Sequence, residues 1–297
     1  MVIFGNDSTM SLLEIKKHIQ TGITLSDKSF KTKLAPNFRL SVYLNADQLV
    51  YCVTDILSRK LLHLKSYNFF NIFSKEEYND TLKQMIAGDD LLRLFYGKIH
   101  VHLLCDCFTL VPENLFDESK KTDLLEFNQR NIQSFNIKHE AILKTEAIII
   151  YGVDIETENI LNSYFPKAKI SHSASSLIET WISPNTEGEM LHCYVQASSI
   201  QIAYVKHAQL KFFNIYQYKT PEDFIYYLMN VVNHLSLDQD KINLFFSGEV
   251  VMDSGIYKLA YKYIRNIHFA QRPQWVQCSD EMIFPGHFYF NLFCIES

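Results

Sequence analysis

The chain has 297 residues, of which 47% are hydrophobic and 21% are charged, and its formal net charge is −5. That length can supply two domains with hydrophobic cores of their own. Proteins that bind nucleic acid normally carry an excess of basic residues, so the acidic balance argues against a nucleic-acid partner. The sequence has no run of 18 apolar residues and no recognisable signal peptide. We therefore expect no direct membrane insertion, and a cytoplasmic protein whose cysteines stay reduced.

The first 37 residues are predicted to form a peripheral extension. Residues 11–20 have the composition of a short helix, and Pro36 interrupts the chain before the first regular strand. The first domain is therefore expected to begin at about residue 38.

From Arg39 onward, the sequence predicts a meander followed by a helical crossover. Three strands are expected at residues 39–45, 49–54 and 60–67, a helical region at residues 75–95, and a fourth strand at residues 98–104. Short turns join the first three strands, so they should pair antiparallel, and the helix allows the fourth strand to pair parallel to the first. A strand at residues 147–151 and helices at residues 154–164 and 173–181 complete this half.

The second half of the chain repeats this order. Strands are expected at residues 191–196, 200–205, 209–216, 241–246 and 267–270, and helices at residues 221–235 and 255–265. Thr220 is a favourable N-cap for the first of these helices, Pro221 suits its first position, and two acidic residues follow.

The repeated order predicts an α/β protein that arose by internal duplication. Each half should form a mixed five-stranded sheet with helices on its faces. The polar segment at residues 183–188 is the expected boundary, which gives one domain at residues 38–182 and a second at residues 189–297.

Three segments resemble the bacterial domain-of-unknown-function 3822 family. They are residues 108–116 (FTLVPENLF), 165–168 (FPKA) and 221–227 (PEDFIYY). The duplicated unit also resembles the actin-like ATPase fold, which is built from two ribonuclease-H-like domains. The resemblance implies this fold from about Arg39, together with a likeness in shape to the cytoplasmic platform proteins of type IV pili and type II secretion. It implies no established activity.

An actin-like fold would place ATP in the cleft between the domains, gripped by one hairpin turn from each. Active members usually carry an Asp-x-Gly element in such a turn, because the Asp organises Mg²⁺ and the Gly lets backbone amides approach phosphate. Here the turns are residues 45–48 (NADQ) and 196–199 (QASS), and neither contains glycine.

The candidate nucleotide-binding residues are accordingly Asn45 and Asp47 in the first turn, Ser198 and Ser199 in the second, and Gly248 after the fourth strand of the second half. The two serines suit a plain polar turn equally well, and Gly248 suits a strand-to-helix turn. We therefore interpret the site as degenerate and expect no cofactor. The alternative is retained binding of ATP with Mg²⁺.

Other chemistries find less support. A ribonuclease-H-like nuclease needs a carboxylate in its first strand, and residues 40–44 and 191–195 contain none. His100 and His102 lie on one strand face, and Cys105 and Cys107 follow, but this spacing lacks a second ligand pair, so no metal site is predicted. No serine or thiol nucleophile motif is present, so no catalytic residue is assigned.

The preferred hypothesis is a non-hydrolysing protein that acts through protein–protein contacts, with an unknown partner or with itself. Leu115 and Phe116 could anchor such a partner, or could belong to a short helix that fixes a loop to the core. The alternatives are a divergent ATP-binding protein or ATPase, and a small-molecule binding module.

Overall fold

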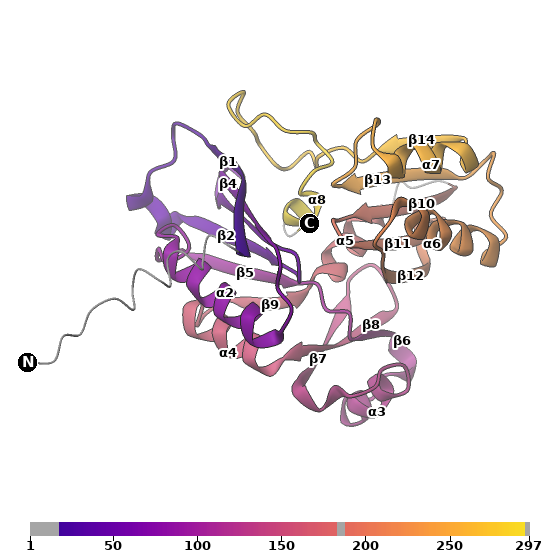
Figure 1. Ribbon diagram of the computed structural model, residues 1–297, viewed down its shortest axis with the longest axis horizontal. Coiled ribbons are helices and arrows are strands. Elements are labelled where there is room, and N and C mark those ends of the chain that lie inside the picture. The colour runs from indigo at the N-terminus through magenta and orange to yellow at the C-terminus, as the bar shows by residue number, and fades with distance from the viewer. Residues whose placement is uncertain (1–17, 183–187, 295–297) are drawn as a thin grey trace, which may run out of the picture.

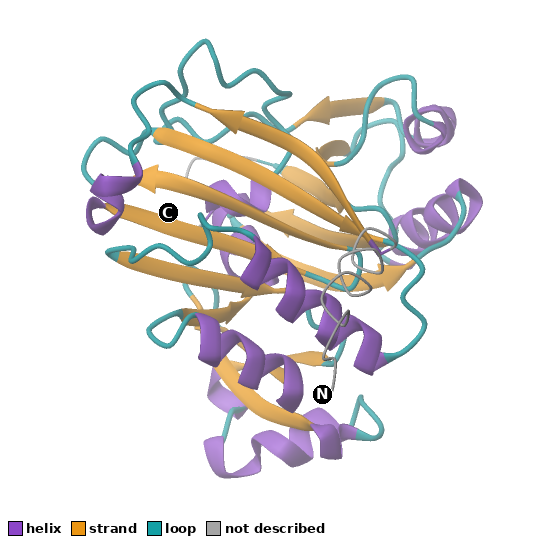
Figure 2. Cartoon of the chain, turned by 60° about the vertical axis from the view of Figure 1, so that its left-hand side comes forward, coloured by secondary structure: helices purple, strands orange, loops and turns teal. Residues whose placement is uncertain are grey.

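The computed structural model describes residues 18–182 and 188–294, which form two large mixed sheets and one small sheet (Figures 1 and 2). In spatial order, the strands of the first sheet are β1 (Ile19–Ser26), β4 (Leu61–Phe69), β3 (Gln48–Asp55), β2 (Phe38–Leu44), β5 (Lys98–Leu103) and β9 (Lys169–His172). The strands of the second are β12 (Gln209–Gln217), β11 (Ser199–Lys206), β10 (Glu189–Val195), β13 (Asn243–Gly248) and β14 (Asn266–Phe269).

The predicted pairing is confirmed in both halves. β2 pairs antiparallel with β3 and parallel with β5. In the same way, β10 pairs antiparallel with β11 and parallel with β13. The centre of each sheet is therefore a hairpin whose first strand also receives the strand that follows the crossover helix.

The small sheet consists of β6 (Phe108–Pro112), β8 (Ala147–Asp154) and β7 (Phe135–Ile142), in that spatial order. The strand expected at residues 147–151 is thus real, but it is the middle strand of this separate sheet. The fifth place in the first sheet belongs instead to β9, whose four residues are too few for alternation to identify a strand. Short helical segments lie between β6 and β7: η2 (Glu113–Leu115), η3 (Glu118–Lys120), α3 (Lys121–Glu126) and η4 (Ile132–Ser134).

The first sheet has a sixth strand that the sequence did not predict. β1 pairs antiparallel with β4 and precedes the 3-10 helix η1 (Thr32–Asn37). The helix expected at residues 11–20 lies mostly outside the described residues, and Ile19 and Gln20 belong to β1. Main-chain pairing therefore ties residues 19–26 to the sheet.

The longer helices are α2 (Lys75–Gly88), α4 (Ile155–Tyr164), α5 (Ser173–Trp181), α6 (Pro221–His234) and α7 (Gly255–Tyr263). The predicted start of α6 is confirmed, because Thr220 accepts the Asp223 amide in a capping box. α2 ends at Gly88 rather than at residue 95. The next residue, Asp89, accepts hydrogen bonds from the hydroxyls of Tyr51 at 2.8 Å and Tyr67 at 2.6 Å, so a tertiary contact ends the helix.

The C-terminal segment, residues 270–294, returns to the first sheet. Gln277 exchanges main-chain hydrogen bonds with Leu61 (2.8 Å) and Arg59 (3.0 Å). A separate core joins this segment to the outer faces of β2, β3 and β4, and its buried members are Tyr43, Val50, Cys52, Leu61, Leu64, Val276, Met282, Leu292 and Phe293. The last helix, α8 (Phe290–Phe293), lies between the two halves and contacts β2, α5 and β13 (Figure 1). The segment predicted as part of the second domain therefore covers the first sheet.

Candidate functional site

The turn between β2 and β3 uses its own polar groups. The Asn45 amide donates to the Gln48 carbonyl at 3.1 Å, which closes the turn. The Asn45 Oδ1 atom accepts the amides of Asp47 at 2.9 Å and Gln48 at 2.7 Å. Tyr78, on α2, donates its hydroxyl to the Asn45 carbonyl at 3.0 Å. Three amides of a turn that would cradle phosphate are thus occupied, and Asn45 itself is buried.

The turn between β10 and β11 is closed in a different way. The Gln196 amide donates to the Ser199 carbonyl at 2.9 Å, and the Ser199 hydroxyl donates to Gln196 Oε1 at 3.2 Å. The Tyr218 hydroxyl donates to the Gln196 carbonyl. Both Gln196 and Ser199 are buried, and their hydrogen bonds to each other close the turn.

The two turns contact each other directly. The Ser198 hydroxyl donates to the Asp47 carboxylate, and Gln196 donates its Nε2 group to the Tyr43 hydroxyl. The structure therefore brings the predicted residues Asp47 and Ser198 together, but as partners of one another.

A third bond crosses the boundary beside them. Gln48 donates its Nε2 group to Glu249 at 2.9 Å, from the turn of the first half to the residue after β13. All three bonds link the first half of the chain to the second.

Gly248 meets a packing requirement. Its φ is +86°, and a Cβ atom at this position would lie 2.1 Å from the Val195 carbonyl oxygen. Its amide donates to the carbonyl of His287, in the C-terminal segment, at 2.8 Å. The ring of His287 is in turn 2.7 Å from the Val250 carbonyl oxygen through Nε2. The glycine thus allows close approach of the protein's own backbone, and its amide is occupied.

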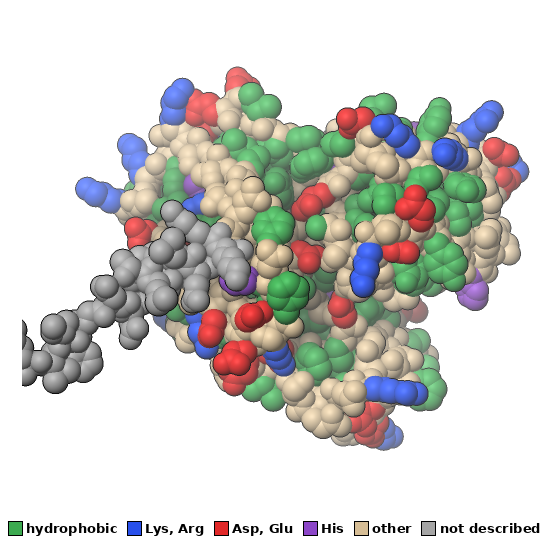
Figure 3. All heavy atoms as spheres, in the orientation of Figure 1, with side chains coloured by type: hydrophobic (Ala, Val, Ile, Leu, Met, Phe, Trp, Pro, Cys, Tyr) green, Lys and Arg blue, Asp and Glu red, His purple; other side chains and the backbone are tan. Residues whose placement is uncertain are grey.

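Between the halves there remains a cavity of about 360 Å³, lined by residues that include Gln48, Ser66, Asn68, Glu249 and Tyr289. Figure 3 shows acidic side chains along this boundary. Within the described part of the chain, no three His, Cys, Asp or Glu side chains come together as ligands for a metal ion.

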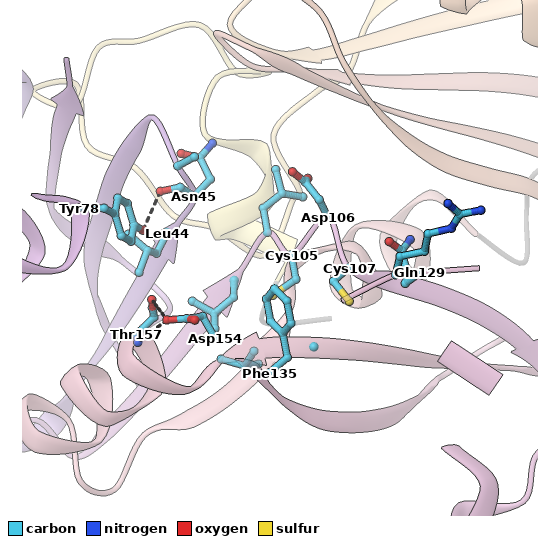
Figure 4. Close-up of a pocket in the computed structure, with 16 residues that line it drawn as sticks. Leu44, Asn45, Tyr78, Cys105, Asp106, Cys107, Gln129, Phe135, Asp154 and Thr157 are labelled. Atoms are coloured by element: carbon cyan, nitrogen blue, oxygen red, sulfur yellow. Dashed lines mark hydrogen bonds between the residues drawn. The ribbon is translucent and has the colours of Figure 1, made fainter. Parts of the chain in front are cut away.

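A second cavity, of about 440 Å³, lies between the first turn, α2 and the small sheet (Figure 4). Its two carboxylates have partners within the chain. Asp154 caps α4 through the Thr157 amide at 2.9 Å and pairs with Lys75. Asp106 accepts two contacts of 2.9 Å from Gln217.

Two cysteines also line this second cavity. Burial raises the pKa of both the Cys105 and the Cys107 thiols, so both are protonated at neutral pH. Both carboxylates that line the cavity are therefore paired, and both of its thiols are in the neutral form.

Two other sequence features have structural explanations. His102 is buried beside Ser171, 3.2 Å from its hydroxyl, and burial lowers its pKa to about 3. Phe116 packs in the core of the small sheet and contacts the ring of His139, whereas Leu115 is 67% exposed. Of the two interpretations of Leu115 and Phe116, the one in which a short helix fixes a loop to the core therefore holds for Phe116.

Sequence reasoning missed several residues that close the boundary. Tyr43, Glu249 and His287 were not predicted, because nothing local distinguishes them. Gln48 and Gln196 lay within the predicted turns, and the signal was available there: a long amide side chain in place of glycine can reach across to the other half.

Two solved structures are similar in fold to this chain. A protein of actin-like ATPase fold and unknown function from Bacteroides thetaiotaomicron is 21% identical, with a TM-score of 0.72 over 81% of this chain and 93% of that one. A chain of the PilM–PilN type IV pilus biogenesis complex is 12% identical, with a TM-score of 0.58 over 87% of this chain and 98% of that one. The chain therefore has the actin-like ATPase fold.

The sequence profile of one family, described as protein of unknown function (DUF3822), matches residues 27–267. The chain belongs to this family. No curated protein matches the sequence. Across residues 18–182 and 188–294, no helix is long and apolar enough to cross a membrane.

Proposed function

We propose that this protein is a non-hydrolysing member of the actin-like fold that acts through protein–protein contacts. The observation that carries the proposal is the closed boundary between the halves. Each predicted nucleotide-binding residue has an intramolecular partner: Asn45 within its turn, Asp47 with Ser198, Ser199 with Gln196, and Gly248 with His287.

The physical argument is the cost of opening this boundary. A nucleotide would have to break the bonds between the two turns and displace α8 from its place beside β2 and β13. A typical hydrogen bond contributes about 0.5–1.5 kcal/mol net, and one to a charged group about 1.5–3 kcal/mol. Without glycines, the turns offer phosphate few amides in return for this loss.

Two further observations support a contact function in the cytoplasm. The similar PilM chain belongs to a complex with PilN, so an actin-like chain of related shape forms a complex with another protein. The six cysteines form no disulfide within the described residues, which suits a reducing compartment. We propose that this chain likewise binds a partner protein or itself, on a scaffold that arose by internal duplication.

Thermal unfolding in millimolar Mg-ATP tests the proposal. A ligand at one hundred times its dissociation constant adds about 2.7 kcal/mol to the free energy of unfolding, which would raise the melting temperature by several degrees. We expect no shift for the wild type. We also expect none for Ser198→Ala, which frees Asp47 from its partner.

A shift in the wild type, or ATP hydrolysis that Asp47→Ala abolishes, would overturn the proposal. Either result would favour the divergent ATP-binding protein that uses Asp47, Ser198, Ser199 and Gly248.

A further inference from the structure

Two described sheet edges lie next to each other without main-chain hydrogen bonds between their strands. β6 is the edge strand of the small sheet, and β12 is the edge strand of the second large sheet. The Phe108 and Phe213 rings are 5.8 Å apart, and Gln217 contacts Asp106, so the two strands run antiparallel where they meet. Figure 1 shows β12 and β6 side by side on the right of the molecule.

Farther along, the two edges enclose a groove. A cavity of about 690 Å³ lies between residues 110–112 of β6, residues 209–213 of β12 and the turn at residues 144–147. The volume is within the range of ligand-binding sites. The two edge strands therefore form no main-chain ladder with each other where the groove leaves room for another chain.

The walls of the groove include unused main-chain groups. On either side of β6, the Cys107 carbonyl accepts the Gly152 amide of β8, and the Glu113 amide donates to the carbonyl of Glu146, the residue before β8. By alternation, Leu110 therefore points its N–H and C=O groups away from β8. On β12, Tyr218 bonds to Ser198 of the turn before β11, so Phe213 points its main-chain groups away from β11. Within the described part of the chain, neither residue's outward main-chain groups form a hydrogen bond.

Side chains in the groove define what would fit there. Leu110, Leu210 and Phe213 supply apolar surface. Lys144 and Lys211 also line the groove and contact neutral oxygens, at 2.9 Å and 2.6 Å, rather than carboxylates. Glu146 also lines the groove, and the charge of Lys144 interacts with the Glu179 carboxylate. Lys211 is therefore the lysine of the groove that has no acidic partner among the described residues.

We propose that this groove binds an extended segment of a partner protein, which adds a strand between β6 and β12 and carries an acidic side chain toward Lys211. Unpaired main-chain groups select an extended conformation, and apolar and charged pockets select the sequence. The inference rests on the proposed contact function and names the surface that performs it.

A simpler role for these residues is protection of the edges. Proline and lysine are typical of strand edges that must not pair, and Pro112 and Lys211 occupy such positions here. Pro112 also shows that proline is tolerated at an outward-facing position of β6, because Pro112 and Leu110 have the same orientation by alternation.

This tolerance provides a sharp variant, Leu110→Pro, which removes an outward N–H group and leaves the β6–β8 ladder intact. Leu110→Val keeps the N–H group and controls for the change of side chain. Thr21→Pro makes the same change at an outward-facing position of β1, far from the groove. Thermal unfolding verifies that each full-length variant is folded.

The probe is a random twelve-residue peptide library, selected on the full chain without nucleotide. Enriched peptides are then synthesised and their affinities measured by fluorescence polarisation. We expect these peptides to contain apolar residues at alternate positions and an acidic residue that can reach Lys211. We also expect about tenfold weaker binding to Leu110→Pro and to Lys211→Glu, and wild-type affinity for Leu110→Val and Thr21→Pro.

Three results would overturn the proposal. An absence of enrichment over an uncoated surface would leave edge protection as the role of the groove. Equal affinity of enriched peptides for the wild type and Leu110→Pro would place binding elsewhere. A wild-type dimer that Leu110→Pro converts to a monomer would assign the groove to a second copy of the chain. None of these results depends on ATP, so the nucleotide test stands or fails separately.

Discussion

The two large sheets share one strand order but differ in what covers them. In the second sheet, α6 and α7 cover one face, and the other face packs against the first half. In the first sheet, α2 supplies part of the cover of one face, whereas the other face lies under the C-terminal segment. The chain thus uses the end of the second half to complete the first. The same segment places α8 at the boundary, so the cover of one sheet and the closure of the cleft are a single structural feature.

The largest expected effect tests whether the C-terminal segment is a true core element. Phe293→Ala should lower the free energy of unfolding by about 3–5 kcal/mol, because the ring is 2% exposed and its loss leaves a cavity. Phe224→Ala, on α6 in the cover of the second sheet, should cost a similar amount. Urea unfolding measures both.

Phe73→Ala is the control, since that ring is 86% exposed and its loss should change stability by less than about 0.5 kcal/mol. If Phe293→Ala were as mild as this control, the C-terminal segment would be only loosely attached. The two sheets would then differ more than their topology suggests.

The second prediction concerns the face of the second sheet that packs on the first half. His192 on β10 lies between the rings of Trp181 and Phe245, at 5.3 Å and 5.4 Å, and burial lowers its pKa to about 3. Its pKa in the unfolded chain is near 6.5, so the native state binds fewer protons between these values. Its contribution to stability is complete above pH 6.5 and is lost as the pH falls toward 3.

The free energy of unfolding should therefore fall less steeply with decreasing pH in His192→Phe than in the wild type, by up to about 1.4 kcal/mol per pH unit. Chemical denaturation at a series of pH values between 7 and 4 measures the slope. His234→Phe is the matched control, because this histidine on α6 is exposed. An unchanged slope for His192→Phe would mean that the packed face opens to solvent before the imidazole is protonated.

The smallest expected effect compares Gly248, at the boundary between the halves, with Gly88 on α2. Gly248→Ala should cost at least about 2 kcal/mol, because φ is +86° and the new Cβ would meet the Val195 carbonyl. Gly88→Ala, at the end of α2, has open space around it and should be neutral or stabilise by up to about 0.5 kcal/mol. Thermal unfolding of the two variants compares them directly, and a mild Gly248→Ala would show that this backbone contact can relax.

Local patterns predicted most of the elements. The start of α6 followed from Thr220 and Pro221, whose effects act within one helical turn. The meanders and the parallel fourth strand followed from turn lengths and from the reach of a crossover helix. These features depend on residues close together in the sequence, which is why they could be predicted.

The incorrect predictions concern features that are determined by contacts between residues far apart in the sequence. α2 stops at Gly88 because hydroxyls from β3 and β4 bind Asp89. The strand at residues 147–154 belongs to the small sheet and not to the first sheet, because β6 and β7 pair with its two edges. Its own alternation could not indicate which sheet it would join.

The sequence by itself determined the repeated order of elements and the absence of glycine from both turns, since both are properties of neighbouring residues. Only the tertiary structure decided what those turns do. Asp47 and Ser198 are 151 positions apart and become partners only when the halves meet. Gly248 donates to His287 only because the C-terminal segment returns to the boundary. A polar side chain is available to a ligand when folding leaves it without a partner, and that depends on contacts that no local pattern encodes.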